Sequence, residues 1–407
     1  MNDEKTWLFI NEHRNDDVRL LALQGARHTD MDLPFVLRQI AGWQAARLKI
    51  PSWAACERIL YPQHLSMEQC SSEQTASYKA NICRRLFPAD SQRSTLTDLT
   101  GGLGVDFSWM AREFHNAIYV EQQETLCQLA RHNMPLLGLK HAQILNTDSA
   151  TALNTIPQSD MIFIDPARRD QHGARTFAIA DCQPDILALE DILLSKADVV
   201  MVKLSPMLDW HKAVEELERN HPGAVREIHI LAVANECKEL LLVLSGKREK
   251  TETTIYCHND AQELVFGIEE TDTQHTGAYI GGLDECRTYH FLYEPNAAVM
   301  KAGNFGILSS RWPVRPLAHN SHLFLSDKRL NDFPGRGFQI DRAGNMSKQQ
   351  LRQLTKDITK ANITVRNMPL DVAQLRRKLH LKEGGDTYIF GSTTEDCTHV
   401  LFVCRKI

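Results

Sequence analysis

The chain has 407 residues, which is more than one hydrophobic core usually serves, so two or three domains are expected. Hydrophobic residues make up 43% and charged residues 24%, as in ordinary soluble proteins, and the net charge of −5 favours no class of partner by itself. The first residues lack the pattern of a signal peptide, and no apolar run reaches about 18 residues, so we expect a cytoplasmic protein without membrane contact. The ten cysteines include no C-x-x-C pair, which predicts reduced thiols and no bound metal.

Residues 1–92 are expected to form a helical N-terminal region. Apolar side chains between Phe35 and Trp53 recur at helical spacing, and Pro51 interrupts this stripe. The serines at positions 66, 71 and 72 are typical of helix starts. Further along, Tyr78 and Lys79 either cover a ligand of the following domain or belong to a packed helix.

Residues 93–248 are expected to form an α/β domain, and its first motif is a glycine loop. The segment LTDLTGGLGVD (residues 96–106) is an apolar run that ends at Asp98, passes three glycines and leads into a helix start. In such a strand–turn–helix unit the backbone can approach a ligand closely, and the familiar ligands are a dinucleotide and S-adenosylmethionine. The dinucleotide fingerprint G-x-G-x-x-G fails here, because its third glycine would fall on Phe107.

Three more apolar runs end in acids, at intervals of 23, 27 and 17 residues from one acid to the next: Glu121, Asp148 and Asp165. Glu121 suits the two hydroxyls of a ribose, and Asp148, followed by Ser149, suits an adenine amino group. The spacing around Asp98 resembles motif I of class I S-adenosylmethionine-dependent methyltransferases. The predicted cofactor-binding residues are Asp98, Thr100, Gly102, Gly104, Glu121, Asp148, Ser149 and Asp165.

Motif I usually has glycines two, four and six residues after the acid. In this sequence these places hold Thr100, Gly102 and Gly104, so the first glycine is replaced. At the end of the domain, the strand-like runs 227–234 and 239–244 are joined by only a few polar residues, which predicts an antiparallel hairpin. A parallel sheet that ends in such a hairpin resembles the Rossmann-like sheet of class I methyltransferases.

The remaining chain predicts two further modules. Residues 249–327 are expected to form a small α+β, ferredoxin-like linker domain. Residues 328–407 read as β-α-β-α-β-β and contain fifteen basic against eight acidic residues, so this module carries about +7 and the rest of the chain about −12. Basic residues gather on one strand end and the helix after it, and a phosphate backbone is the partner that this charge favours: Arg366, Arg376, Arg377, Lys378 and Lys382.

Taken together, these motifs resemble a bacterial family of class I methyltransferases with a C-terminal THUMP-like domain, and the match covers nearly the whole chain. The segments that carry it lie at residues 66–79, 98–106, 165–169, 203–209, 294–298, 333–336 and 384–390. The resemblance implies a methyltransferase fold, S-adenosylmethionine as cofactor and an RNA substrate (ribosomal or transfer RNA), bound by the THUMP-like domain at residues 328–407. The glycine loop is also similar to that of a bacterial ribosomal-RNA guanine-N2 methyltransferase family.

Asp165-Pro166-Ala167-Arg168 stands where amino-group methyltransferases carry Asp/Asn-Pro-Pro-aromatic. We therefore expect Asp165, Pro166 and Arg168 to be catalytic, with an exocyclic amine as the favoured target, although Arg168 replaces the aromatic residue that stacks on the base. Uracil-C5 RNA methyltransferases have a similar loop, but they need a cysteine after the fifth strand, and residues 199–206 contain none. The predicted substrate-binding residues are Arg168, Arg169, Lys203, Arg376, Arg377 and Lys378.

Two alternatives stay open. One is a methyltransferase that acts on a protein or a small molecule, which the basic C-terminal module argues against. The other is an RNA-binding protein whose methyltransferase domain has lost its activity. The four acids at the strand ends argue against that loss, while Thr100 and Arg168 leave it open.

Overall fold

The computed structural model describes residues 4–23, 31–62, 64–87, 95–168, 178–246, 252–272 and 278–407. Contacts within the chain divide it into two compact units. The first unit comprises Met1–Arg226 and Glu239–Thr251, and the second comprises Glu227–Lys238 and Glu252–Ile407. No helix in these ranges is long and apolar enough to cross a membrane.

The first unit opens with the helical region that the sequence predicted. Its helices are α1 (Glu4–His13), α2 (Val18–Leu23), α3 (Leu33–Lys49), α4 (Pro51–Ala55), α5 (His64–Gln69) and α6 (Glu73–Leu86). Pro51 ends the stripe by starting α4, where its missing N–H would have no partner in the helix anyway. Ser72 caps α6 by accepting a hydrogen bond from the N–H of Thr75 at 3.2 Å, whereas Ser66 lies inside α5 and does not start it.

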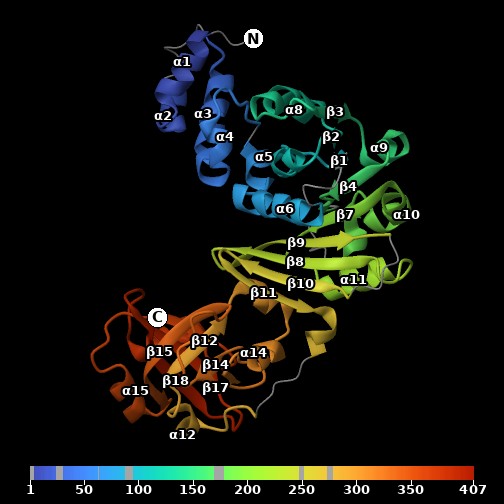
Figure 1. The fold of residues 1–407 in the computed structure, drawn as a ribbon. Helices are drawn as coiled ribbons and strands as arrows, with labels where there is room; N and C mark the ends of the chain where they lie inside the picture. Colours follow the sequence, from blue (N-terminus) through green and yellow to red (C-terminus); the bar gives the residue numbers. More distant parts are fainter. Residues whose placement is uncertain are drawn as a thin grey trace. The chain divides into compact units, whose positions relative to one another are not determined.

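A sheet follows in which parallel strands lie side by side in the order β3-β2-β1-β4-β7 (Figure 1). The strands are β1 (Thr95–Asp98), β2 (Asn116–Glu121), β3 (Ala142–Asn146), β4 (Ser159–Ile164) and β7 (Ala197–Leu204). The connecting helices are α7 (Val105–Met110), α8 (Glu124–Leu136), α9 (Ser149–Thr155) and α10 (Ile186–Lys196). A two-stranded ribbon, β5 (Ala167–Arg168) and β6 (Cys182–Gln183), lies between β4 and α10 along the chain.

The predicted antiparallel hairpin is present. After α11 (Trp210–Glu218), strand β8 (Val225–Val233) turns back into β9 (Glu236–Leu244) through Ala234 and Asn235. Both turn residues have positive φ, 51° and 62°, which a two-residue type I′ hairpin requires. Strand β9 runs antiparallel to β7, so an antiparallel strand follows the parallel ones in the strand order.

In the second unit β8 pairs in parallel with β10 (Thr254–Asn259), which pairs antiparallel with β11 (Gln262–Gly267). The next elements are α12 (Leu283–Cys286), β12 (Phe291–Pro295), α13 (Ala297–Ala302), α14 (Gly306–Arg311), β13 (Arg315–Pro316) and β14 (Phe324–Ser326). The range 249–327 therefore contributes strands to two sheets, because β12, β13 and β14 belong to the second one. Glu294 lies in β12, and α13 begins after it at Ala297, with Asn296 as its cap.

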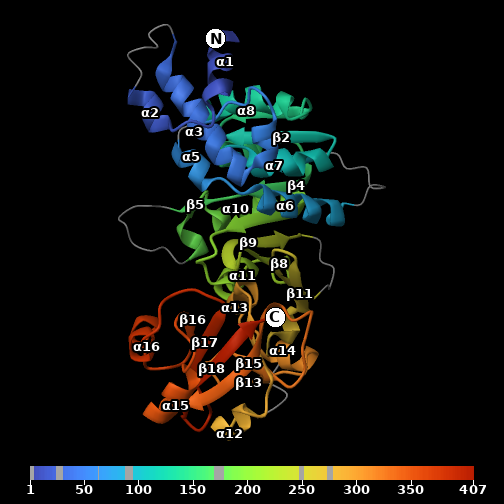
Figure 2. The same ribbon diagram turned by 90° about the vertical axis from the view of Figure 1, so that its left-hand side faces the viewer.

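The second sheet has the order β13-β14-β12-β15-β18-β17-β16. Its last part shows the predicted β-α-β-α-β-β pattern in β15 (Gly335–Asn345), α15 (Lys348–Leu354), β16 (Asn362–Val365), α16 (Val372–Leu379), β17 (Thr387–Thr393) and β18 (His399–Lys406). Alternate residues of β17 and β18 face different cores, as the pleat of a strand requires. Phe390 and Phe402 lie in one core, while Ile389 and Leu401 lie in the other, which α15 and α16 cover (Figure 2).

Candidate active site

The carboxyl ends of β1, β2 and β4 lie at one edge of the parallel sheet, and each ends in or is followed by an acid. The sequence placed Asp98, Glu121 and Asp165 at these positions. The structure brings the three together through the glycine loop, because that loop is hydrogen-bonded to each of them.

The backbone N–H groups of the loop donate within the protein. That of Thr100 donates to Asp98 Oδ1 at 2.9 Å, and that of Gly102 donates to Glu121 Oε2 at 3.0 Å. The N–H of Gly101 donates to the carbonyl of Val120 at 2.8 Å, and that of Gly104 donates back to Gly101 at 2.8 Å. These four donors are therefore directed at protein acceptors.

The glycines are required by space and by backbone conformation. A Cβ at Gly101 would lie 2.2 Å from the ring of Tyr119, whose hydroxyl donates to the carbonyl of Gly102. Gly102 and Gly104 have φ of 56° and 86°, the left-handed region that side chains disfavour. The loop is thus held in one tight conformation by its own sequence.

Thr100 has a function that a glycine there could not supply. Its hydroxyl accepts a hydrogen bond from the backbone N–H of Asp165 at 2.7 Å, so the first residue of the loop fixes the end of β4. The threonine that replaces the first glycine of motif I therefore connects the glycine loop to the segment that begins at Asp165.

We predict that Thr100→Val lowers the free energy of unfolding by about 1 kcal/mol, because it leaves the Asp165 N–H without its acceptor. Thr100→Ser keeps the hydroxyl and should retain most of the stability. Urea unfolding of both variants measures the difference. Equal stability of the valine variant and the unsubstituted protein would show that this hydrogen bond contributes nothing.

The other predicted cofactor-binding residues differ in their burial and in their hydrogen-bond partners. Glu121 is buried, and its second oxygen, Oε1, accepts the N–H of Gln123 at 2.8 Å. Asp148 is exposed and caps α9, where it accepts from both the N–H and the hydroxyl of Thr151, which lowers its pKa. The hydroxyl of Ser149 donates to the carbonyl of Leu99 at 2.8 Å, next to the glycine loop.

Asp98 is a buried acid at the start of the loop. Burial raises its pKa well above the ordinary value of an aspartate, and neighbouring carboxylates, those of Asp106, Asp165 and Glu121, add to this shift. This shift favours the neutral form of Asp98, so another anion nearby would be disfavoured, whereas a cation would favour the charged carboxylate.

Behind Asp165 lies a group of charged side chains that we call the lysine–carboxylate network: Ser71, Lys79, Asp106, Asp165, Lys203 and Glu239. Lys203, at the end of β7, places its Nζ 2.6 Å from Asp165 Oδ2, 3.0 Å from Ser71 Oγ and 3.4 Å from Asp106 Oδ2. Burial alone would lower the pKa of Lys203, but the surrounding carboxylates outweigh it and hold the pKa well above its usual range.

The deepest member of the network is Lys79 of α6, whose side chain is 0% exposed. Its Nζ lies 2.9 Å from Asp106 Oδ1 and also pairs with Glu239 of β9. Lys79 therefore belongs to a packed helix, which was one of the two alternatives for it. By contrast, the side chain of Asp165 is 38% exposed, so the network is open to a ligand at this carboxylate.

Sequence reasoning missed Ser71, Asp106 and Glu239 as members of the site. Ser71 and Asp106 lie inside segments that the family resemblance had marked, residues 66–79 and 98–106, so a signal for them existed. Glu239 had only a weak one, namely an acid next to the apolar run of a buried strand.

The remaining predicted residues are dispersed. Pro166 is buried after Asp165, Arg168 lies in β5, and Arg169 falls outside the residues that the structure describes. In the second unit, Arg377 and Lys378 are exposed on α16. Arg376 is half-buried and donates to the carbonyl of Ala361 at 3.0 Å.

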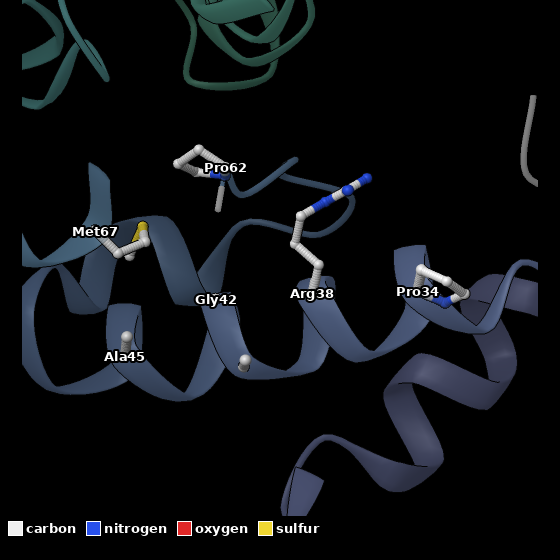
Figure 3. A pocket seen from close by; sticks show the side chains of 7 residues that line it. Pro34, Arg38, Gly42, Ala45, Pro62 and Met67 are labelled. Carbon is white, nitrogen blue, oxygen red and sulfur yellow. The ribbon is translucent and has the colours of Figure 1, made fainter. Parts of the chain in front are cut away.

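A cavity of about 310 Å³ lies elsewhere in the first unit, along α3 (Figure 3). Its lining is mostly apolar with one arginine: Pro34, Arg38, Ala41, Gly42, Ala45, Pro62 and Met67. None of the predicted site residues lines it. In the described ranges no group of three or more His, Cys, Asp or Glu side chains is arranged to hold a metal ion.

The strand order, the glycine loop and the acids at the strand ends define a class I methyltransferase fold, which confirms the fold predicted from the sequence. A THUMP domain-like family matches residues 335–406, and a ferredoxin-like domain family matches residues 291–334. No curated protein matches the chain.

Among solved structures, the chain is similar to a "putative methyltransferase" from Porphyromonas gingivalis W83, at 32% identity and a TM-score of 0.83. The match covers 100% of this chain and 99% of that one, so the chain belongs to the same family as that protein. A second similar structure is the tRNA m1G37 methyltransferase of M. jannaschii, with 14% identity and a TM-score of 0.32, covering 44% of this chain and 52% of that one.

Proposed function

We propose that the protein is an S-adenosylmethionine-dependent methyltransferase that modifies a base in RNA, with an exocyclic amine as the favoured target. One observation carries the choice of cofactor. The N–H groups of Thr100, Gly101, Gly102 and Gly104 donate inside the protein, two of them to the carboxylates of Asp98 and Glu121. A dinucleotide would bring a pyrophosphate, which needs backbone N–H groups of this loop as donors. Because these four already donate to protein acceptors, the loop fits S-adenosylmethionine better than a dinucleotide.

The donor set fits S-adenosylmethionine, which has two hydroxyls on its ribose and two positive charges, a sulfonium and an ammonium. Each oxygen of Glu121 accepts one backbone N–H, so each keeps a lone pair for a ribose hydroxyl. Asp98 and Asp165 would face the positive groups, while Gly102 and Gly104 let the backbone approach. Asp148 and Ser149, next to the loop, would hold the adenine. When bound, this cofactor supplies an electrophilic methyl group.

Asp165 is the residue that we propose to act on the target. Its half-exposed carboxylate can accept a hydrogen bond from an exocyclic amine and so orient the nitrogen lone pair for attack. Lys203 and the hydroxyl of Thr100 hold Asp165 at its side chain and its backbone, so we propose a positioning role for both. Pro166 stiffens the loop, and the guanidinium plane of Arg168 would stack on the base or pair with a phosphate.

The RNA substrate is supported by the second unit. Residues 335–406 match a THUMP domain-like family, and the last 80 residues carry a surplus of about seven positive charges. A surplus of this size favours a polyanion over a small neutral substrate. Arg376, Arg377 and Lys378 remain the proposed contacts on α16.

We expect isothermal titration calorimetry to detect S-adenosylmethionine binding and no binding of NAD. Glu121→Gln should weaken the affinity about tenfold or more, because it removes a charged acceptor of both ribose hydroxyls. Glu124→Gln, three residues on in an exposed pair with Arg131, is the control and should bind normally. Binding of NAD in place of S-adenosylmethionine would refute the proposed cofactor.

A further inference from the structure

Two arginines of the second unit share one buried carboxylate. Arg336 of β15 donates to Glu294 Oε2 through Nε at 3.1 Å and also through Nη2. Arg366, directly after β16, donates through Nη2 to Glu294 Oε1 at 3.1 Å. The sequence had marked Glu294 and Arg336 through the segments 294–298 and 333–336, and the proposed function uses neither.

The backbone fixes this arrangement. Glu294 and Arg336 stand opposite each other in the antiparallel register of β12 and β15. A Cβ at Gly335 would lie 2.1 Å from the carbonyl oxygen of Glu294, so only glycine lets the two strands approach this closely. The side chain of Glu294 is 4% exposed, which restricts both guanidiniums to defined positions.

The two positive charges of Arg336 and Arg366 exceed the one that neutralises Glu294. A buried carboxylate must be paired, and one guanidinium is sufficient to neutralise it. The second leaves a net charge of +1, and the side chains of Arg336 and Arg366 are 37% and 38% exposed, so each is accessible to a ligand in part. In addition, Nε of Arg366 is buried and has no hydrogen-bond partner among the described residues.

We propose that Arg336 and Arg366 together bind one phosphate of the RNA backbone, with Glu294 as the positioning residue. Guanidinium forks match the oxygens of a phosphate geometrically, and fixing them in advance reduces the entropy lost on binding. The inference rests on the proposed RNA substrate and adds a second contact region to the one on α16.

The test is the salt dependence of RNA binding by the full chain. The probe is a fluorescein-labelled, single-stranded RNA of mixed sequence, followed by anisotropy between 50 and 300 mM KCl (roughly the range in which such contacts are measured). Arg366→Gln leaves Glu294 paired with Arg336, so the fold should be retained. We expect the slope of log affinity against log salt to fall by about 0.7, the contribution of one phosphate, and the affinity at 0.1 M salt to fall about tenfold.

Two further variants make the outcome specific. Arg366→Lys keeps the charge but loses the fork, so it should keep the slope and still bind more weakly. Arg405→Gln removes an exposed arginine of the same unit, paired with Asp341, and should change neither. If the unsubstituted protein binds the RNA and Arg366→Gln shows the same slope and affinity, the cluster is structural and the inference is wrong. If the unsubstituted protein binds no RNA, the proposed substrate itself fails.

Discussion

Replacing Lys79 by methionine is expected to lower the free energy of unfolding by about 3–5 kcal/mol. Lys79 is fully buried between Asp106 and Glu239, and methionine has a similar length but no charge. Without the ammonium group, the carboxylates of Asp106 and Glu239 would remain in the protein interior, where Ser71 contacts both and Lys203 contacts Asp106. Breaking one side of a buried ion pair is among the most destabilising single changes.

Two variants separate this effect from the loss of packing. Adding Glu239→Gln to Lys79→Met removes the unpaired buried charge of Glu239 and should restore much of the lost stability. Lys212→Met, on the exposed surface of α11, should change the unfolding free energy by less than about 0.5 kcal/mol. Urea unfolding measures all three. A Lys79→Met protein as stable as the Lys212→Met control would contradict the buried network.

Asp165→Asn should reduce methyl transfer by about a hundredfold or more while cofactor affinity stays within about tenfold. Asparagine keeps the size of the side chain and the backbone hydrogen bond to Thr100. It removes the negative charge that orients the target amine and replaces one acceptor oxygen by a donor. The effect should therefore fall mainly on turnover, with a smaller change in cofactor affinity.

Transfer of tritium from methyl-labelled S-adenosylmethionine to RNA of a strain that lacks the gene measures turnover, and calorimetry measures cofactor affinity. Asp191→Asn, exposed and paired with His221, is a control that should keep full activity. Full activity of Asp165→Asn would exclude Asp165 from the reaction. Loss of cofactor binding in that variant would instead make it a binding residue only.

The strand ends could be predicted because the signal is local. An apolar run that ends in an acid or a glycine turn contains both the buried strand and the residue at its carboxyl end, as at Asp98, Glu121 and Asp165. The hairpin of β8 and β9 could also be predicted, because the short segment between the two strands leaves no room for a crossover helix.

The lysine–carboxylate network could not be predicted from such local signals. Lys79 and Glu239 are 160 residues apart, and a lysine in a helix is usually a surface residue, so only the packing of α6 shows that this one is buried. Thr100 is a second case. Compared with motif I, Thr100 only marks the place of an absent glycine. In the structure its hydroxyl accepts the N–H of Asp165, and such a contact between residues far apart in sequence could not be predicted.

The central claim is that this protein methylates RNA at the strand-end site, and nucleoside mass spectrometry tests it most directly. Total RNA from a deletion strain is compared with RNA from the parent and from the deletion strain carrying the Asp165→Asn gene. We predict that one methylated nucleoside present in the parent is absent from the deletion strain, and that the Asp165→Asn gene does not restore it while the unsubstituted gene does. Identical sets of methylated nucleosides in the parent and the deletion strain would contradict the proposed function.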